Sequence, residues 1–174
     1  MRPVLALLLC AGVAHAEPAK DLRKEVIVAA PAAAVYAAWT TNAGAQTFFA
    51  PKTNIELARG GAFEIYFAPD APPGKRGAEG LRVLSFIPGE MVSFEWNAPP
   101  TFPEIRKKGP STFVVVQVTA LEPNKTKVVL HHLGWGQGAD WDKLYGYFDK
   151  AWDVVLGRLQ TRFAEGRAID FRKM

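Results

Sequence analysis

The stretch that decides the fold is WDKLYGYFDKAWDVVLGRLQTRF, at residues 141–163. Its large apolar side chains recur at steps of three and four residues, with charged side chains between them, which places the apolar residues on one face of an α-helix. The pattern predicts an amphipathic helix of about 24 residues, about 36 Å long, that ends at Gly166. The apolar positions are Trp141, Leu144, Tyr145, Phe148, Trp152, Val155, Leu156, Leu159 and Phe163.

Before this helix the chain has a different period. Apolar and polar residues alternate in several short runs, which is typical of strands with one buried face. Glycine and proline pairs separate most of the runs and indicate tight turns between antiparallel neighbours. The predicted strands are 24–28, 53–57, 62–67, 81–86, 91–96, 112–121 and 126–133.

Two short helices are expected after the first strand. Pro31 is a favourable first helical residue, and the alanine-rich run 32–39 that follows has Val35 and Trp39 at helical spacing. A second small turn of helix is expected within 42–49.

This order of elements predicts an α+β fold. A sheet with one apolar face must be covered, and the terminal helix is the only element long enough to cover it. We expect a curved antiparallel sheet of about six to seven strands wrapped around the long C-terminal helix. The proline-rich loops 69–77 and 97–110 are long enough to act as lids over an internal cavity.

Composition supports a single globular domain. The chain has 174 residues, of which 49% are hydrophobic and 22% charged, and this excludes a disordered or collagen-like protein. The net charge of +4 is spread along the sequence. The basic doublets Lys107-Lys108 and Arg172-Lys173 lack neighbouring stacking aromatics, so we do not expect nucleic-acid binding.

The N-terminus has the pattern of a secretory signal peptide. Arg2 is followed by a ten-residue apolar run at 4–13, and Ala14 and Ala16 are the small residues that a signal peptidase recognises. The run is half of the roughly 20 residues that a membrane span requires, so no membrane span is expected. We therefore expect a periplasmic or secreted protein, cleaved after Ala16.

The single cysteine, Cys10, raises the alternative of a lipoprotein. Leu9 precedes it, where lipid attachment requires a small residue, and this argues against acylation. Cleavage after Ala16 removes Cys10, so the exported chain has no disulfide. The expected organisation is a signal peptide at 1–16, an N-terminal extension at 17–23, a domain at 24–166 and a basic tail at 167–174.

Several strings, in this order, resemble the START-like (SRPBCC) superfamily of helix-grip proteins. They are V-x-x-P-A-x-x-V-Y-x-A-W at 28–39, Gly-Gly-Ala-Phe at 60–63, Pro-Gly before Val-Ser-Phe-Glu-Trp at 88–96, and V-x-L-x-H-x-G-W at 128–135. The most similar branch is that of the homologues of the activator of heat-shock-protein-90 ATPase. The resemblance implies a helix-grip fold with a hydrophobic pocket. The superfamily includes lipid carriers, hormone receptors, polyketide cyclases and co-chaperones, so fold alone does not select a function.

The sequence offers few residues for catalysis. His131 and His132 are adjacent and point to opposite faces of a strand, so they do not form a metal site together, and we expect neither a metal nor a cofactor. The Gly-x-Ser-x-Gly and Gly-x-Gly-x-x-Gly motifs do not occur. His132 shares the presumed inner face with Val128 and Leu130. Two interpretations stay open: a buried histidine bonded to a neighbour, or a polar group in a pocket.

The expected function is binding of an apolar or amphipathic small molecule, such as a lipid, without catalysis. Trp135 and Trp141 flank the loop into the long helix, and we place them at the mouth of the pocket with Arg82 as a candidate charge. The predicted lining residues are Phe63, Phe67, Phe94, Trp96, Phe113, His132, Tyr145, Phe148 and Trp152.

The sequence also allows two other classes of function. An enzyme of cyclase or hydrolase type would use the same pocket, with His132 as a weak candidate for the acid–base group. A protein-binding or chaperone-like module would instead act through an exposed apolar patch on the outer face of the sheet.

Overall fold

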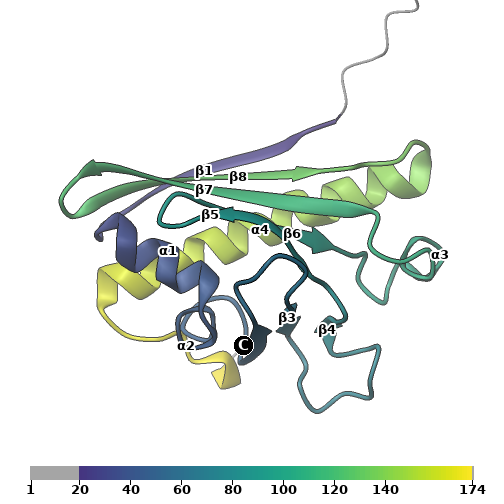
Figure 1. The fold of residues 1–174 in the computed structure, drawn as a ribbon. Coiled ribbons are helices and arrows are strands. Elements are labelled where there is room, and N and C mark those ends of the chain that lie inside the picture. Colours follow the sequence, from purple (N-terminus) through teal and green to yellow (C-terminus); the bar gives the residue numbers. More distant parts are fainter. Residues whose placement is uncertain (1–19, 174) are drawn as a thin grey trace, which may run out of the picture.

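The structure is a computed structural model that describes residues 20–173 (Figure 1). The predicted signal peptide, Cys10 and the first three residues of the predicted N-terminal extension lie outside the described residues.

A large antiparallel sheet forms one side of the domain. Within residues 20–173 it has five strands in the order β1-β8-β7-β6-β5, and it lies across the top of the molecule in Figure 1. All neighbouring pairs are antiparallel. The strands are β1 (Leu22–Val28), β5 (Val83–Ile87), β6 (Met91–Trp96), β7 (Thr112–Glu122) and β8 (Lys125–Leu133).

A smaller sheet lies below it. Its strands, in the described part of the chain, are β2 (Lys52–Ile55), β3 (Phe63–Tyr66) and β4 (Gly77–Ala78), in that order. β4 was not predicted, because it has two residues at the end of a proline-rich loop. Backbone hydrogen bonds from Phe63 N to Leu81 O (2.8 Å) and from Val83 N to Gly61 O (2.9 Å) join the small sheet to the start of β5. The predicted α+β helix-grip class is confirmed, with its strands divided between two connected sheets.

The two short helices after β1 are present as α1 (Ala32–Thr40) and α2 (Asn42–Ala45). α1 follows Pro31, and the extended backbone of Thr41 ends it. A Cβ atom at Gly44 would lie 2.3 Å from the carbonyl oxygen of Ala37, so only glycine lets α2 approach α1 this closely. One further short helix, α3 (Pro103–Arg106), lies within the predicted lid loop 97–110.

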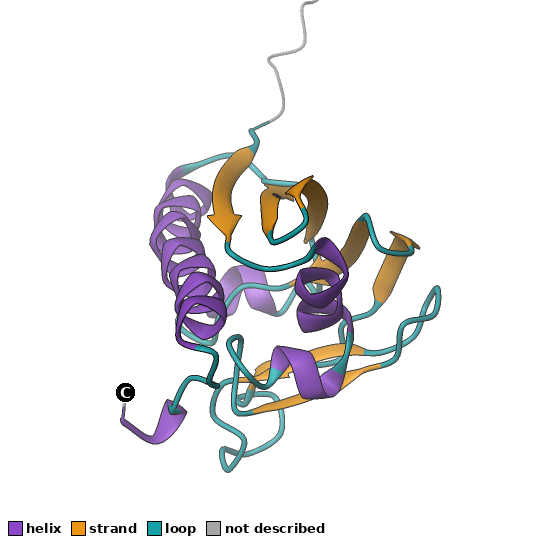
Figure 2. Cartoon of the chain, turned by 90° about the vertical axis from the view of Figure 1, so that its left-hand side faces the viewer, coloured by secondary structure: helices purple, strands orange, loops and turns teal. Residues whose placement is uncertain are grey.

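The long helix α4 (Ala139–Glu165) has 27 residues and ends at Gly166, which adopts a left-handed backbone conformation with φ of +66°. It runs along the large sheet, as Figures 1 and 2 show. On the β1 side, Lys24 Nζ contacts carboxylate oxygens of Asp149 at 2.7 Å and Asp153 at 2.8 Å. These ion pairs hold one flank of α4 against the sheet edge. Between α4 and the sheets lies the core, in which Leu144, Phe148, Trp152, Leu156 and Leu159 are buried.

The segment after α4, predicted as a basic tail, returns towards α2. Ile169 N donates a hydrogen bond to Thr47 O at 2.9 Å, and η1 (Phe171–Lys173) follows. The Arg158 guanidinium lies 5.6 Å from the centre of the Phe171 ring, so the tail contacts α4 as well. None of the helices between residues 20 and 173 has the length and apolar character needed to cross a bilayer.

A chain of buried hydrogen bonds connects α4 to three strands of the large sheet. Trp152 Nε1 donates to His132 Nδ1 at 3.0 Å. The other ring nitrogen, His132 Nε2, lies 2.9 Å from Thr112 Oγ1, and the Thr112 hydroxyl donates to Trp96 O at 3.0 Å. Because the single hydroxyl proton goes to Trp96 O, the ring donates from Nε2 and accepts at Nδ1. This chain, which we call the His132 chain, therefore requires a neutral imidazole.

The environment of His132 favours the same protonation state. Its side chain is fully buried, and this burial lowers its pKa from 6.5 to about 3. A proton on Nδ1 would also face the Trp152 N–H, which already points at that atom.

Removing the central hydroxyl should destabilise the fold. In Thr112→Val the His132 N–H and the Trp96 carbonyl lose their partner in a buried site, so we expect the free energy of unfolding to fall by about 1–3 kcal/mol. Thr119→Val, on the exposed face of the same strand, is the matched control and should change it by less than about 0.5 kcal/mol. Urea unfolding measures both, and equal effects of the two substitutions would contradict this role of Thr112.

The buried imidazole should also make stability depend on pH. Its pKa is lower in the folded protein than in the unfolded chain, so protonation favours unfolding. The stabilisation is complete above pH 6.5 and is lost as the pH falls towards 3. From this group we expect a loss of about 1.4 kcal/mol per pH unit across that window.

The check is urea unfolding of the wild type and His132→Gln between pH 4 and 7. The stability difference between the two proteins should shrink as the pH falls. The ring carbon shifts of His132 in the wild type, followed by NMR, should stay those of a neutral imidazole down to pH 5. A ring that protonates near pH 6.5 in the folded protein would refute the assignment.

Candidate functional site

A cavity of about 590 Å³ opens beside α4. Its walls come from α4, the loop between β3 and β4, the segment after β6, and Phe49. Figure 1 shows the elements that surround it: the small sheet lies below the large sheet, and α4 runs along the large sheet. The volume falls within the range of about 300–1,000 Å³ that is usual for small-molecule sites.

The closed end of the cavity is aromatic. The rings of Phe49 and Trp96 stack with 5.8 Å between their centres, and Trp96 lies 5.3 Å from Trp152. Phe148 stacks on Trp152 from the preceding helical turn. All four side chains are buried. The cavity therefore reaches the hydrophobic core and is more than a surface depression.

The rim of the cavity is apolar and exposed. Phe67 and Tyr147 each keep 45% of their surface exposed, and Val154 keeps 51%. Phe67 extends the aromatic wall, because its ring lies 6.0 Å from that of Phe49 in an edge-to-face contact. Three large apolar side chains thus border the opening to a larger apolar space.

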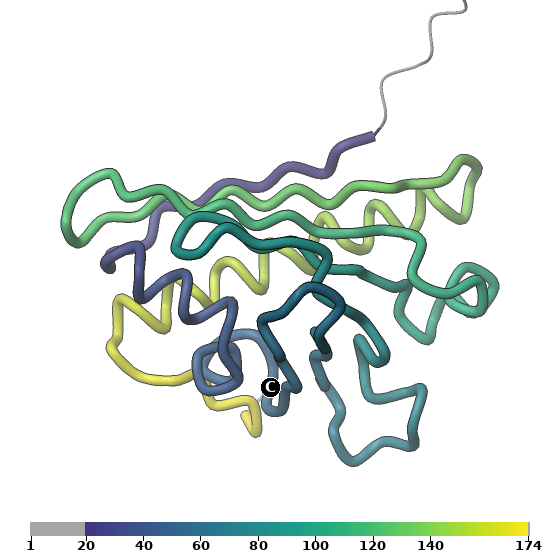
Figure 3. The backbone as a smooth tube through the Cα atoms, viewed as in Figure 1, coloured from purple at the N-terminus to yellow at the C-terminus, as the bar shows by residue number. Residues whose placement is uncertain are grey.

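The two predicted lid loops both contribute to the walls, and Arg106 ties them together. Arg106 Nη1 donates to Ala98 O at 2.5 Å, while Nη2 donates to Gly74 O at 3.0 Å and Gly77 O at 2.9 Å. Figure 3 shows that both loops protrude at the same end of the molecule. The guanidinium therefore fixes the spacing between the two loops.

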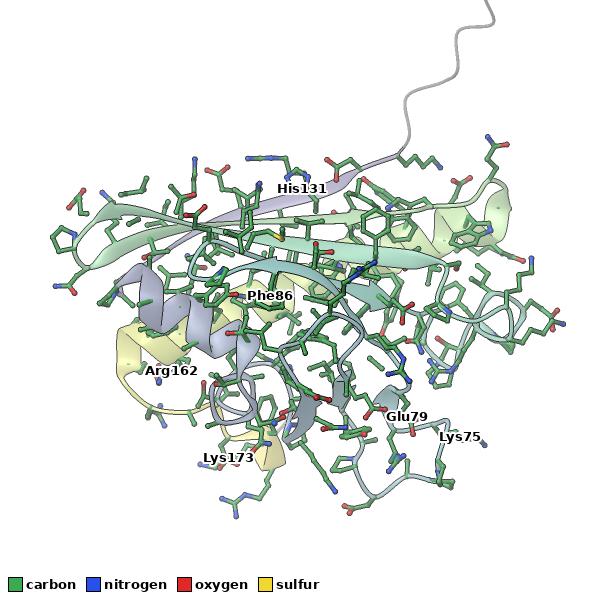
Figure 4. All side chains as sticks on the ribbon, viewed as in Figure 1. Lys75, Glu79, Phe86, His131, Arg162 and Lys173 are labelled. Atoms are coloured by element: carbon green, nitrogen blue, oxygen red, sulfur yellow. The ribbon has the colours of Figure 1, made fainter. Side chains whose placement is uncertain are left out.

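Glu79 stabilises the conformation of loop 69–77 by hydrogen bonds to residues of that loop. Its carboxylate accepts hydrogen bonds from Gly74 N at 3.0 Å, Arg76 N at 2.9 Å and Arg76 Nε at 2.7 Å. Burial alone would raise the pKa of Glu79, but these hydrogen bonds and the charge of Arg76 outweigh it, so the pKa lies below its ordinary value. Glu79 is therefore ionised at neutral pH and compensates the charge of Arg76. Figure 4 shows Glu79 and Lys75 on this segment of the chain.

The charged side chains along the walls share one sign. Lys75 and Arg76 come from the loop, and Lys150 and Arg158 come from α4. Within residues 20–173, no Asp or Glu side chain lines the cavity. Partial burial lowers the pKa of the Arg158 guanidinium below its ordinary value.

Four of the nine predicted lining residues do line this cavity: Phe67, Trp96, Phe148 and Trp152. Phe63 and Phe94 lie in the closed core, where their rings stack with 3.7 Å between centres. The roles of Phe63 and Phe94 in ligand binding stay predictions.

The other three predicted lining residues lie elsewhere. His132 is buried in the His132 chain and does not line the cavity. Phe113 alternates with the inward-facing Thr112 and Val114, so it lies on the outer face of the large sheet with 36% of its surface exposed. Tyr145 Oη donates to Asp21 O at 3.3 Å, beside the start of β1.

The three residues predicted at the mouth do not line the cavity either. Arg82 is exposed and donates to Gly60 O at 2.9 Å. Trp135 packs on His132 with 4.3 Å between ring centres and donates to its carbonyl oxygen. Trp141 packs over Gly136, where a Cβ atom would lie 2.3 Å from the indole ring. Both tryptophans lie near the N-terminal end of α4, and the Trp135 ring is 6.1 Å from that of Phe148, which does line the cavity.

One group of wall residues that sequence reasoning missed forms a stripe on α4. Tyr147, Lys150, Val154 and Arg158 follow one another at steps of three and four residues, so they share a helical face beside the buried apolar face. The stripe mixes apolar and basic side chains, so it does not stand out as an apolar face, although its spacing was readable from the sequence.

The remaining missed residues have no comparable signal. Phe49 follows α2 in a stretch with no regular period, and Lys75 and Arg76 belong to an irregular loop. The positions of Lys75 and Arg76 depend on how Arg106 holds the carbonyls of Gly74 and Gly77, 32 and 29 residues away, and contacts between such distant residues leave no local pattern.

A second hollow lies on the outer face of the large sheet, where Figure 4 shows His131. Strand side chains such as Gln117 and Lys127 line it, and it does not reach the aromatic core. The exposed apolar residues Phe113 and Leu121 lie at opposite ends of β7, with Gln117 and Thr119 between them on the same face. This surface lacks the continuous apolar character of the cavity.

The cavity walls supply apolar surface and positive charge. In the described part of the chain, no three His, Cys, Asp or Glu residues are grouped as metal ligands would be. The arrangement suits binding of an apolar body.

Solved structures similar to this chain share its fold. A protein from Mesorhizobium loti, MLL2253, is 19% identical with a TM-score of 0.64, over 82% of this chain and 95% of its own. The Aha1 dimer from Colwellia psychrerythraea is 18% identical with a TM-score of 0.63, over 83% of this chain and 96% of its own. CalU16 from Micromonospora echinospora is 18% identical with a TM-score of 0.61, over 87% of this chain and 78% of its own.

These identities show the fold alone, and no curated protein matches the chain in sequence. The family model described as Activator of Hsp90 ATPase homolog 1-like protein matches residues 29–164, which run from the end of β1 almost to the end of α4. This match covers most of the chain and agrees with the helix-grip architecture, so the chain belongs to the family of Activator of Hsp90 ATPase homolog 1-like proteins.

Proposed function

We propose that this protein binds an apolar or amphipathic small molecule in the cavity beside α4 and does not transform it. The observation that carries the proposal is the continuous apolar path from the exposed rim at Phe67 and Tyr147 to the buried rings of Trp96 and Trp152. Burial of an apolar ligand along this path would contribute about 25 cal/mol per Å² of surface removed from water.

The ordered conformation of the two lid loops also supports the proposed binding site. Arg106 and Glu79 give the loops a defined conformation, so part of the entropic cost of ordering a binding site is met before the ligand arrives. The charged side chains that the described residues contribute to the walls are cationic, and the imidazole of His132 is engaged elsewhere.

Filling the cavity should abolish binding without unfolding the protein. Ala151 lines the cavity from α4, and in Ala151→Phe the added ring would occupy the ligand's space. We expect the neutral fluorescent probe N-phenyl-1-naphthylamine to bind this variant at least about tenfold more weakly than the wild type. Fluorescence titration measures the affinity, and circular dichroism checks the fold.

Ala164→Phe is the matched control, because Ala164 lies on the same helix, is exposed and does not line the cavity. It should bind the probe as the wild type does. Equal affinities of a folded Ala151→Phe variant and the wild type would refute the proposed site. Native mass spectrometry of protein isolated from a cell envelope should in addition show a lipid-like adduct.

We also propose that the protein is exported, on the sequence pattern of residues 1–16 alone. When the full chain is produced in a bacterial host, the envelope or medium fraction should contain a form that begins at Glu17. Ala14→Arg should block the processing, because signal peptidase requires a small residue there. Recovery of the wild type in the cytoplasm with an intact N-terminus would overturn this proposal.

A further inference from the structure

We propose that the ligand carries a negatively charged headgroup, which Lys75 and Lys150 hold at the mouth of the cavity. The inference rests on the proposed function and adds the chemical class of the ligand: a single-chain anionic amphiphile. Its starting point is the charge of the walls, where four cationic side chains and, among the described residues, no acidic one surround an apolar space.

The charges of α4 are sorted by face. Asp149 and Asp153 contact Lys24 on the β1 side, while the neighbouring Lys150 lines the cavity. Adjacent residues of an α-helix are about 100° apart around its axis, so one residue separates an acidic flank from a basic one. The carboxylates nearest in sequence to Lys150 are therefore already engaged, and they point away from the cavity.

The loop shows a similar arrangement. Arg76 lies above the Tyr66 ring and pairs with Glu79, which compensates its charge. The next residue, Lys75, pairs with no carboxylate among the described residues, and the same holds for Lys150. Two uncompensated ammonium groups thus belong to opposite walls, one on the loop and one on the helix.

This combination favours one kind of ligand. An apolar chain gains most from the aromatic end of the cavity, while its headgroup stays at the rim near water. A carboxylate or phosphate there would form charge-assisted hydrogen bonds with the two ammonium groups, whereas a cationic headgroup would be repelled by both of them. The walls therefore select on charge as well as on hydrophobicity.

The test compares three ligands that carry an alkyl chain of nine or ten carbons and differ in headgroup charge: decanoate, decan-1-ol and decyltrimethylammonium. Their affinities follow from tryptophan fluorescence, because Trp96 and Trp152 line the cavity. The wild type should bind decanoate about tenfold more tightly than decyltrimethylammonium, with decan-1-ol between them. High salt should weaken decanoate binding and leave decan-1-ol binding unchanged.

The double variant Lys75→Gln/Lys150→Gln should lose this preference and keep its affinity for decan-1-ol. The control Lys127→Gln/Lys143→Gln removes the same net charge from residues that do not line the cavity, and it should keep the preference. If all three ligands bind the wild type equally, or if the double variant keeps the preference, the headgroup inference fails while the cavity stands. If none of them binds, the proposed function fails as well.

Discussion

The position of α4 depends on one buried, neutral imidazole. His132 accepts a hydrogen bond from Trp152 of the helix and donates one to Thr112, whose hydroxyl donates to the Trp96 carbonyl. Helix and sheet therefore share one network in which each of these polar groups has a partner. A buried polar network of this kind tolerates only one relative placement of its members, because each unmatched group in the interior costs free energy. The His132 chain therefore adds a directional constraint on the position of α4 to the constraint from apolar packing.

The cavity follows from this placement. Lys24 holds one flank of α4 to the edge strand β1, and Trp152 holds its centre under β6 to β8. The opposite flank faces the small sheet and the two lid loops, where the cavity lies and where the rings of Tyr147 and Phe102 make contact with 6.0 Å between their centres. The protein therefore combines a tightly fixed helix with an incompletely covered side, and the space beside α4 is the result of that asymmetry.

Much of the fold was readable from local patterns. Three of these patterns extend over only a few residues each, so they can be recognised without knowledge of the tertiary structure. They are the helical period of residues 141–163, the alternation in β6 to β8 and the glycine at position 166. The division into two sheets was not readable, because it depends on which strands pair, and the hydrogen bonds that join the two sheets link residues 61–63 to residues 81–83, far apart in sequence. Which aromatic and basic side chains line the cavity was not readable for a related reason. Phe63 and Phe94 have the right chemistry but face each other in closed core, and Lys75 reaches the cavity only through the folding of its loop.

Arg106 gives the mouth of the cavity a particular mechanical character. One guanidinium spans three carbonyl groups that belong to two separate loops. Widening the gap between the loops therefore means breaking two bonds of the same guanidinium, those from Nη2 to Gly74 O and Gly77 O. Passage of a bulky molecule would then behave as an all-or-none opening with a slow release rate, and the residence time of a bound molecule would be governed by this latch more than by its affinity for the walls.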